Sequence, residues 1–264
     1  MTVLRKSWSL YKAFFRASLT ADLEYRANFV TRILTDIFWY AAQIMSFEVI
    51  YRHTETIGSW NVHQTRVFLG IIFVVDAFYM IFVSENLDRF SEKVRKGDLD
   101  LLLTKPVNSQ FMVSLQRANT AILGNLLMGL SWLTWALLSL PEFSWPRLLW
   151  LLVLIPCSLV LTYACRFFFS SMAVIFTRAE NLQFLWYQIY RLGMRPDSIY
   201  VPWMRILLMS ILPVAMVASV PARALLEDPS PLLFLWTITL ALFFLWLSGR
   251  FWRLALRFYS SASS

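Results

Sequence analysis

Long apolar runs separated by short polar segments dominate the chain after residue 28. Because about 20 apolar residues cross the hydrocarbon core of a bilayer, such runs predict membrane-spanning helices. Six spans are predicted, at 29–50, 67–83, 111–140, 148–176, 200–212 and 232–256. The pattern predicts an all-α integral membrane protein in which residues 1–264 form one transmembrane domain.

The first 25 residues follow a different pattern, in which apolar and basic positions alternate. Leu4, Trp8, Tyr11 and Phe15 recur at steps of three and four, which places them on one face of a helix. A basic helix with an aromatic face suits the membrane interface. We therefore predict an interfacial helix over 3–25, and packing of this helix against the rest of the protein is the alternative.

Of the charged side chains inside the predicted spans, Asp36, Glu48, Asp76 and Arg166 are candidate functional residues, because charge at membrane depth is costly. Asp36 can pair with Arg32 one turn earlier, and Glu48 lies near the far end of its span. Arg166 lies towards the end of its span and can snorkel to the interface. For Asp76, in the middle of the second span, a functional role and a structural hydrogen bond are equally open.

Prolines interrupt the apolar pattern in the last third of the chain. The predicted fifth span meets Pro213 after thirteen residues, and Pro221 follows eight residues later, next to Ala222. Proline breaks or kinks a helix, and an apolar segment too broken to span is a candidate re-entrant element. We predict a broken extracellular segment over 213–231, and an ordinary kinked span is the alternative.

Composition agrees with a membrane location, since 58% of the residues are hydrophobic and 15% are charged, against about 25% charged in soluble domains. Cytoplasmic flanks of membrane helices are rich in Lys and Arg, which accounts for the net charge of +8 without a nucleic-acid partner. Sixteen of the 24 basic residues fall at the two termini, in 84–109 or in a loop predicted at 177–199, and four in the opposite loops. We therefore predict that both termini and these two loops are cytoplasmic.

The most strongly charged stretch, 84–109, separates the second and third predicted spans. Leu87, Phe90 and Val94 share one helical face, and Gly97 is expected to end that helix as a C-terminal cap. The expected ion pairs at i,i+4 spacing are Glu85–Arg89 and Glu92–Lys96. The sequence thus predicts a short amphipathic helix, a glycine break and an apolar strip in this loop.

The chain has no G-x-x-x-x-G-K-[ST] motif, so it does not cradle ATP phosphates by that route. We predict no enzyme activity of its own, and no cofactor or metal site in this chain. The spacings of its two histidines, His53 and His63, and of Cys157 and Cys165 match no known ligand set. Any ATP-driven work would come from a separate polypeptide that carries ATP and Mg²⁺.

Two strings resemble one known family. The residues R-K-G-D-L-D-L-L-L-T-K-P-V-N, at 95–108, are similar to the cytoplasmic loop of permease subunits of type 2 ATP-binding-cassette (ABC) exporters, in a bacterial six-span subgroup. The residues I-L-P-V-A-M-V-A-S-V-P-A-R-A-L-L, at 211–226, resemble the segment before the last span of the same subgroup. The layout of the whole chain matches as well.

This resemblance implies a multi-pass subunit of the bacterial inner membrane that forms the substrate path. A coupling helix at 85–96 would sit in a cleft of the ATPase, and Pro213, Pro221 and Ala222 would belong to an extracellular re-entrant hairpin. Two ATPases and two permeases, identical or related, would form the transporter within membrane lipid. The coupling residues it implies are Glu85, Leu87, Arg89, Phe90, Lys93, Val94, Arg95, Gly97 and Asp98.

Two other functions stay open at the level of the sequence. A polytopic enzyme acting on lipid would need a convergent constellation of polar groups at one membrane depth. A secondary transporter independent of an ATPase would often show an internal repeat, and none is evident. The sequence does not name the substrate, although its apolar spans favour an amphipathic or lipid-like one.

Overall fold

The computed structural model describes residues 3–24, 26–140, 143–176, 180–227 and 230–259. Within these ranges every extended regular element is a helix, which confirms the predicted class. The α-helices are α1 Val3–Glu24, α2 Arg26–Tyr51, α3 Val62–Tyr79, α4 Glu85–Asp88, α5 Phe90–Lys96, α6 Asp98–Leu103, α7 Ser109–Leu115, α8 Leu123–Leu138, α9 Leu148–Ser171, α10 Glu180–Gly193, α11 Pro202–Ile206, α12 Met216–Leu226 and α13 Pro231–Ala255. Two π-helices, η1 Met80–Ser84 and η6 Leu207–Ile211, extend α3 and α11.

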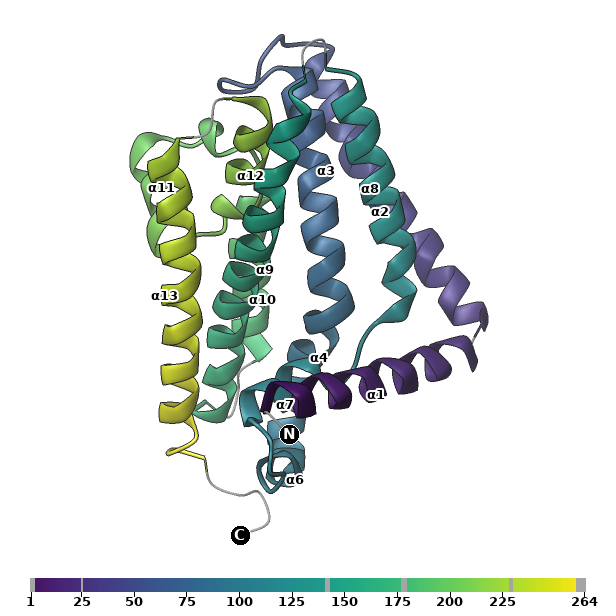
Figure 1. The fold of residues 1–264 in the computed structure, drawn as a ribbon, viewed down its shortest axis with the longest axis vertical. Helices are drawn as coiled ribbons and strands as arrows, with labels where there is room; N and C mark the ends of the chain where they lie inside the picture. Colours follow the sequence, from purple (N-terminus) through teal and green to yellow (C-terminus); the bar gives the residue numbers. More distant parts are fainter. Residues whose placement is uncertain (1–2, 25, 141–142, 177–179, 228–229, 260–264) are drawn as a thin grey trace.

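The long helices stand side by side, and α1 lies across their lower end (Figure 1). We call this lower end, which also holds α4 to α7, the basal end, and the opposite end the distal end. Helix α3 packs on α8, and α9 packs on α13, while α12 lies between α3 and α9. A Cβ atom at Gly70 of α3 would lie 2.8 Å from Cα of Leu133 in α8, so the close contact of these helices requires glycine there.

Five described helical runs are long and apolar enough to cross a membrane. They are Val30–Tyr51, Val62–Lys96, Thr120–Leu138, Trp145–Val174 and Pro231–Ala255. The arms Pro202–Ile211 and Met216–Leu226 form a bent pair with an angle of 102° between them. The protein is therefore a multi-pass membrane protein with five or six candidate spans.

The single span predicted over 111–140 is divided into two helices. Helix α7 ends at Leu115 and α8 begins at Leu123, after a short 3-10 turn at Thr120–Ile122. The polar residues at 116–119 lie between them and bond to distant parts of the chain instead of to one helix. The apolar run that remains, Thr120–Leu138, is still long enough to span.

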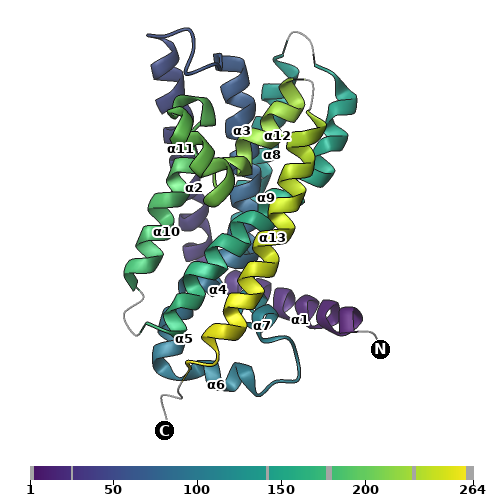
Figure 2. The same ribbon diagram turned by 90° about the vertical axis from the view of Figure 1, so that its left-hand side faces the viewer.

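The segment predicted as a basal loop, 177–199, contains the amphipathic helix α10. The buried side chains of Trp186 and Tyr190, four residues apart, face the bundle. Figure 2 shows that α10 rises from beside the basal half of α9 towards the distal end. There the N–H of Ser59 lies 3.5 Å from Oγ of Ser198. The predicted loop is therefore wrong over its described residues, and the predicted loop residue Arg178 lies outside them.

Both ends of the bent pair lie at the distal end of the molecule. The first arm follows Ser198, and the second arm ends where a guanidinium nitrogen of Arg147 donates to the carbonyl of Leu225, at 3.4 Å. The segment predicted as a fifth span, 200–212, thus contains the first arm of this bent pair, which we call the hairpin. The turn follows Leu212, whose φ of −121° and ψ of 74° lie outside the α-helical region, which is disfavoured before proline.

The three residues predicted for this broken segment are all buried in the hairpin. Pro213 begins the turn, as predicted, whereas Pro221 and Ala222 lie inside α12. The prediction that Pro221 interrupts the helix is wrong. Packing of α12 against both α3 and α9 compensates for the backbone hydrogen bond that this proline removes.

Candidate coupling site at the basal end

The charged stretch folds as the three short helices α4, α5 and α6. Gly97 adopts a left-handed conformation with a φ of 80°, and its N–H bonds to the carbonyls of Lys93 and Val94, which confirms the predicted cap. The helix predicted over 85–96 is interrupted at Arg89, where φ is −87° and ψ is 0°. Helix α6 is the lowest helix of the basal end in Figure 1.

The apolar face of the stretch points into the protein. Leu87 and Phe90 are buried among residues of α7, α9 and α13, and Val94 packs at the edge of this cluster. The ring of Phe90 lies 5.8 Å from that of Trp252. Leu87, Phe90 and Val94 therefore attach the stretch to the bundle and do not form its outward surface. The outward face carries Arg89, Glu92, Arg95, Lys96, Asp98 and, on α6, Leu101.

Asp88 connects α4 to two long helices. Its carboxylate accepts a hydrogen bond from Nη2 of Arg166 in α9 at 2.6 Å, and one from the hydroxyl of Tyr187 in α10 at 2.9 Å. Gln183 in α10 donates to the Asp88 carbonyl at 2.8 Å. Arg166 is fully buried, so the prediction that it snorkels to the interface is wrong. Its guanidinium instead reaches the carboxylate of Asp88 and lies over the ring of Tyr187.

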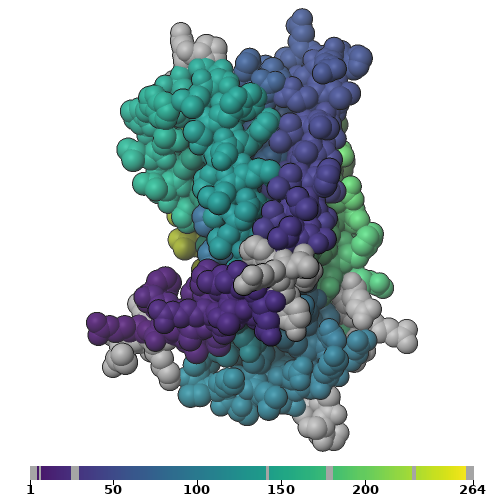
Figure 3. All heavy atoms as spheres, turned by 90° about the vertical axis from the view of Figure 1, so that its right-hand side faces the viewer, coloured from purple at the N-terminus to yellow at the C-terminus, as the bar shows by residue number. Residues whose placement is uncertain are grey.

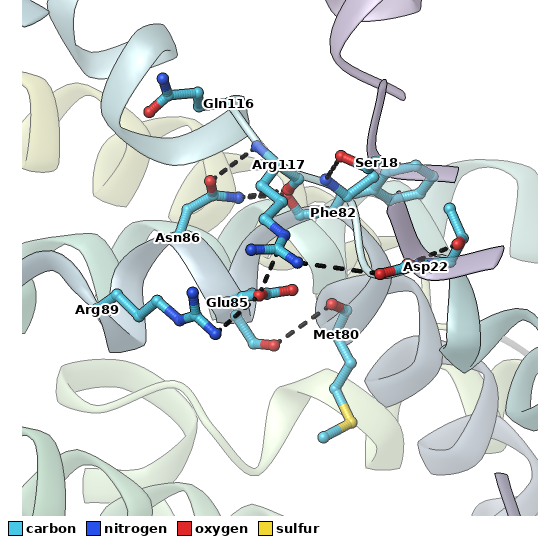
Figure 4. Close-up of polar contacts among 12 residues, drawn as sticks. Ser18, Asp22, Met80, Phe82, Glu85, Asn86, Arg89, Gln116 and Arg117 are labelled. Carbon is cyan, nitrogen blue, oxygen red and sulfur yellow. Dashed lines mark hydrogen bonds and ion pairs between the residues drawn. The ribbon is translucent and has the colours of Figure 1, made fainter. Parts of the chain in front are cut away.

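A second connection joins α4 to the break between α7 and α8 (Figure 4). The side-chain amide of Asn86 donates to the carbonyl of Arg117 at 2.6 Å and accepts from its N–H at 2.9 Å. The Arg117 guanidinium lies 3.2 Å from the carboxylate of Glu85 and 3.9 Å from that of Asp22. Glu85 also forms the predicted pair with Arg89, at 3.3 Å. One amide and two carboxylates thus hold this break in place.

The other backbone donors of the break are bonded by α1 and η1. A π-helix leaves a carbonyl without its helical partner, which makes it available to another segment. Buried N–H groups need such acceptors. The bonds are Asn119 N to Ile81 O at 2.8 Å, Ala118 N to Ser18 Oγ at 3.1 Å, and Thr120 N and Oγ1 to Asp22 Oδ2 at 3.0 and 2.6 Å. Helix α1 therefore packs on the protein through Ser18 and Asp22, while its Trp8 is exposed.

A groove of about 390 Å³ runs between α1 and the stretch, lined by Phe14, Ser18 and Lys93 among others. Lys93 donates to the side-chain carbonyl of Gln116 at 3.3 Å. Burial, and then the charge of Arg89, lowers the pKa of Lys93. On the exposed side of α5, the hydrogen bond from Lys96 lowers the pKa of Glu92.

The three other charged candidates in the spans have partners on neighbouring helices. Asp36 accepts from Asn125 at 2.8 Å, and not from Arg32 as predicted. Glu48 holds Arg66 through two bonds of 2.6 and 2.8 Å. The Tyr190 hydroxyl donates to Asp76 at 3.2 Å. Glu48 lies at the distal end, far from Arg166, so these groups do not converge at one depth as an enzyme would require.

A separate ionic cluster closes the hairpin at the distal end. Asp197 is fully buried and accepts from Nε of Arg205 at 2.6 Å and from Nη2 of Arg223 at 2.7 and 2.8 Å. Its own N–H donates to the hydroxyl of Ser219 at 3.3 Å. One carboxylate thus bonds both arms of the hairpin.

Sequence reasoning missed Asp88, Asn86, Arg117 and Asp197. Asp88 and Asn86 lie inside the predicted coupling stretch, so their polarity was a usable signal. Their partners stand 78 and 31 residues away, and no local spacing indicates such pairs. For α10, the spacing of four between Leu182, Trp186 and Tyr190 was a signal for a helix.

The geometry defines a helical membrane protein whose polar basal loop is bonded to several of its long helices. The chain belongs to the ABC-2 family of transporters, because the family model described as "ABC-2 family transporter protein" matches residues 37–263. It is the membrane permease subunit of an ABC transporter and does not itself have ATPase activity. No curated protein and no solved structure matches the chain.

Proposed function

We propose that this permease is one half of the membrane part of an exporter and receives the work of ATP hydrolysis at its basal end. An ATPase subunit docks on the outward faces of α5 and α6 from the cytoplasm. Two copies of the ATPase, each with ATP and Mg²⁺, and a second permease, identical or related, complete the transporter. The large exposed apolar face of α2 suits a neighbouring permease or lipid.

The observation that carries this proposal is the double connection of α4. Asp88 bonds to α9 and α10, and Asn86 bonds to the break before α8. A displacement of α4 therefore acts on three long helices through short polar contacts. Such rigid connections transmit a small shift at a docking site into a rearrangement of packed helices.

The distribution of charge and the position of the hairpin support the proposed orientation. Basic residues of α5, α13 and the N-terminal helix gather at the basal end, which supports cytoplasmic termini in a bacterial inner membrane. The hairpin made by the two bent arms then enters from the outer side and returns to it. Its turn at Pro213 lies among apolar side chains of the bundle, so buried protein surrounds its irregular backbone.

Surface variants of the docking face test this function, because replacing Leu87 or Phe90 would disrupt the core. Leu101 is 67% exposed on α6, so Leu101→Asp changes the docking surface without loss of packing. We expect it, and separately Arg89→Glu with Arg95→Glu, to remove most of the ATPase that co-purifies with the permease. Arg257→Glu, also basic and exposed at the basal end, is the matched control. Full retention of the ATPase by both variants would overturn the proposal.

A further inference from the structure

A groove separate from the coupling site lies between α2 and α10. It has a volume of about 750 Å³ and extends towards Ile57 of the distal loop. Figure 2 shows α10 beside α2 around the mid-height of the molecule, and Figure 3 shows α2 on the outer face above α1. Such a volume lies in the range of about 300–1,000 Å³ that is typical of small-molecule sites.

Two arginines, Arg191 and Arg195, give this groove its charge. Among the described residues that line it, theirs are the only charged side chains. Neither guanidinium has a hydrogen bond or an ion pair within the described part of the chain. Both arginines are exposed, and a guanidinium without a protein partner can bind an anion through paired hydrogen bonds. Arg191 and Arg195 are therefore available to bind an anionic ligand.

The remaining lining of the groove is mainly apolar. Trp39, Phe47 and Ile50 line the α2 side, with Gln43 between them. A lipid-like chain packs on such a surface, while arginine binds the phosphate or carboxylate of a head group through two parallel hydrogen bonds. The combination suits a molecule with one anionic end and one apolar end.

The carboxylates close to this groove do not neutralise the two arginines, either within the chain or from the same surface of a second copy. The carboxylates of α2, Asp36 and Glu48, already bond Asn125 and Arg66. The carboxylate of Asp197, close in sequence, holds Arg205 and Arg223. These three carboxylates are already paired within the chain, which leaves the two arginines available to an anionic ligand.

We infer that the groove binds an anionic amphiphile, with its head group on Arg191 and Arg195 and its chain along Trp39 and Phe47. This inference rests on the proposed function, because it names the substrate class that the transporter moves. The groove opens on the distal half of the molecule, the side on which an exported amphiphile leaves.

Binding is tested with the complete permease–ATPase complex in neutral detergent, using phosphatidylglycerol and phosphatidylcholine with brominated chains. Bromine quenches nearby tryptophan, and Trp39→Phe identifies the share of quenching that comes from the groove. We expect half-maximal quenching of Trp39 at a concentration at least about tenfold lower for phosphatidylglycerol. Arg191→Gln with Arg195→Gln should remove this preference, whereas Arg32→Gln, an exposed arginine on α2 outside the groove, should keep it.

A second arm separates a transported molecule from a permanently bound lipid. In vesicles holding the complex, a chain-labelled phosphatidylglycerol should change leaflet only with MgATP, and the double arginine variant should reduce the rate at least about tenfold. Equal quenching by both lipids, or binding without ATP-dependent movement, would overturn the inference. Either result can occur while the ATPase still co-purifies, so the proposed docking would stand.

Discussion

The two ends of this permease each contain a carboxylate bonded to arginine, but the two networks differ in reach. At the distal end, Asp197 joins residues that lie within 26 positions of it. At the basal end, Asp88 and Asn86 bond residues up to 99 positions away, on α9, α10 and the break before α8. The distal cluster therefore holds one local element closed, whereas the basal network connects a surface loop to the whole bundle.

This difference predicts that variants at the distal end lower the stability of the hairpin. Variants at the basal end should instead weaken the connection between α4 and the long helices. The largest loss of stability is expected for Asp197→Ala. It leaves Arg223, 16% exposed, without its carboxylate, and breaking a buried pair in this way costs about 3–5 kcal/mol. Thermal unfolding in detergent measures the loss, and Glu227→Ala, an exposed residue just after α12, is the control. A fall in melting temperature no larger than that of the control would contradict the role of Asp197.

Gly193→Ala tests the contact between α10 and the turn of the hairpin. A Cβ atom there would lie within 3.0 Å of the carbonyl of Val214, closer than real Cβ contacts. We expect a loss of roughly 1–3 kcal/mol, typical of overpacking, measured by the same unfolding assay. Gly124→Ala is a matched control, because its nearest neighbour would be 3.5 Å away. Equal stability of the two variants would show that the turn adapts.

Asn86→Ala should have a smaller effect on stability and a local one on dynamics. It removes two hydrogen bonds to the backbone of Arg117, at about 1–2 kcal/mol in total. Faster hydrogen exchange at 116–120, with unchanged exchange in the distal hairpin, is the expected result. Faster exchange at both ends would contradict the separation of the two networks.

Glu92→Gln should have the smallest effect of the series. The pair with Lys96 is exposed and lies on the outward face of α5, where ion pairs contribute little. Melting temperature and exchange of the bundle helices should stay as in the unchanged protein. A clear loss of either would show that the outer face of α5 contributes to the fold.

The sequence allowed prediction of the features that depend on local pattern. The apolar runs of α2, α3, α9 and α13, the cap at Gly97 and the turn at Pro213 are all encoded within a few residues. The division of the third span is not, because the bonds of 117–120 go to Ser18, Asp22 and Asn86, far away in the chain.

The same reason explains the errors in the last third of the chain. The amphipathic sequence of α10 was assigned to a loop because its buried partners lie far away in the chain. Because α10 instead packs on the bundle and ends at the distal end, the next segment begins there and forms a hairpin arm. Arg166 was expected at the interface because nothing in its own span indicates Asp88, 78 residues earlier. The position of Arg166 was decided by a long-range polar contact, whereas that of α10 was decided by the burial of Trp186 and Tyr190.

In the proposed mechanism, α4 transmits the action of the ATPase to the long helices through Asp88. Hydrogen exchange of α9 and α10 in the complex, with and without MgATP and vanadate, tests it without knowledge of the substrate. In the unchanged complex we expect exchange at the basal end of α9 and in α10 to respond to the nucleotide. In Asp88→Asn, with the ATPase still bound, this response should be lost, whereas the control Arg257→Glu should keep it. Persistence of the response in Asp88→Asn would contradict transmission through Asp88.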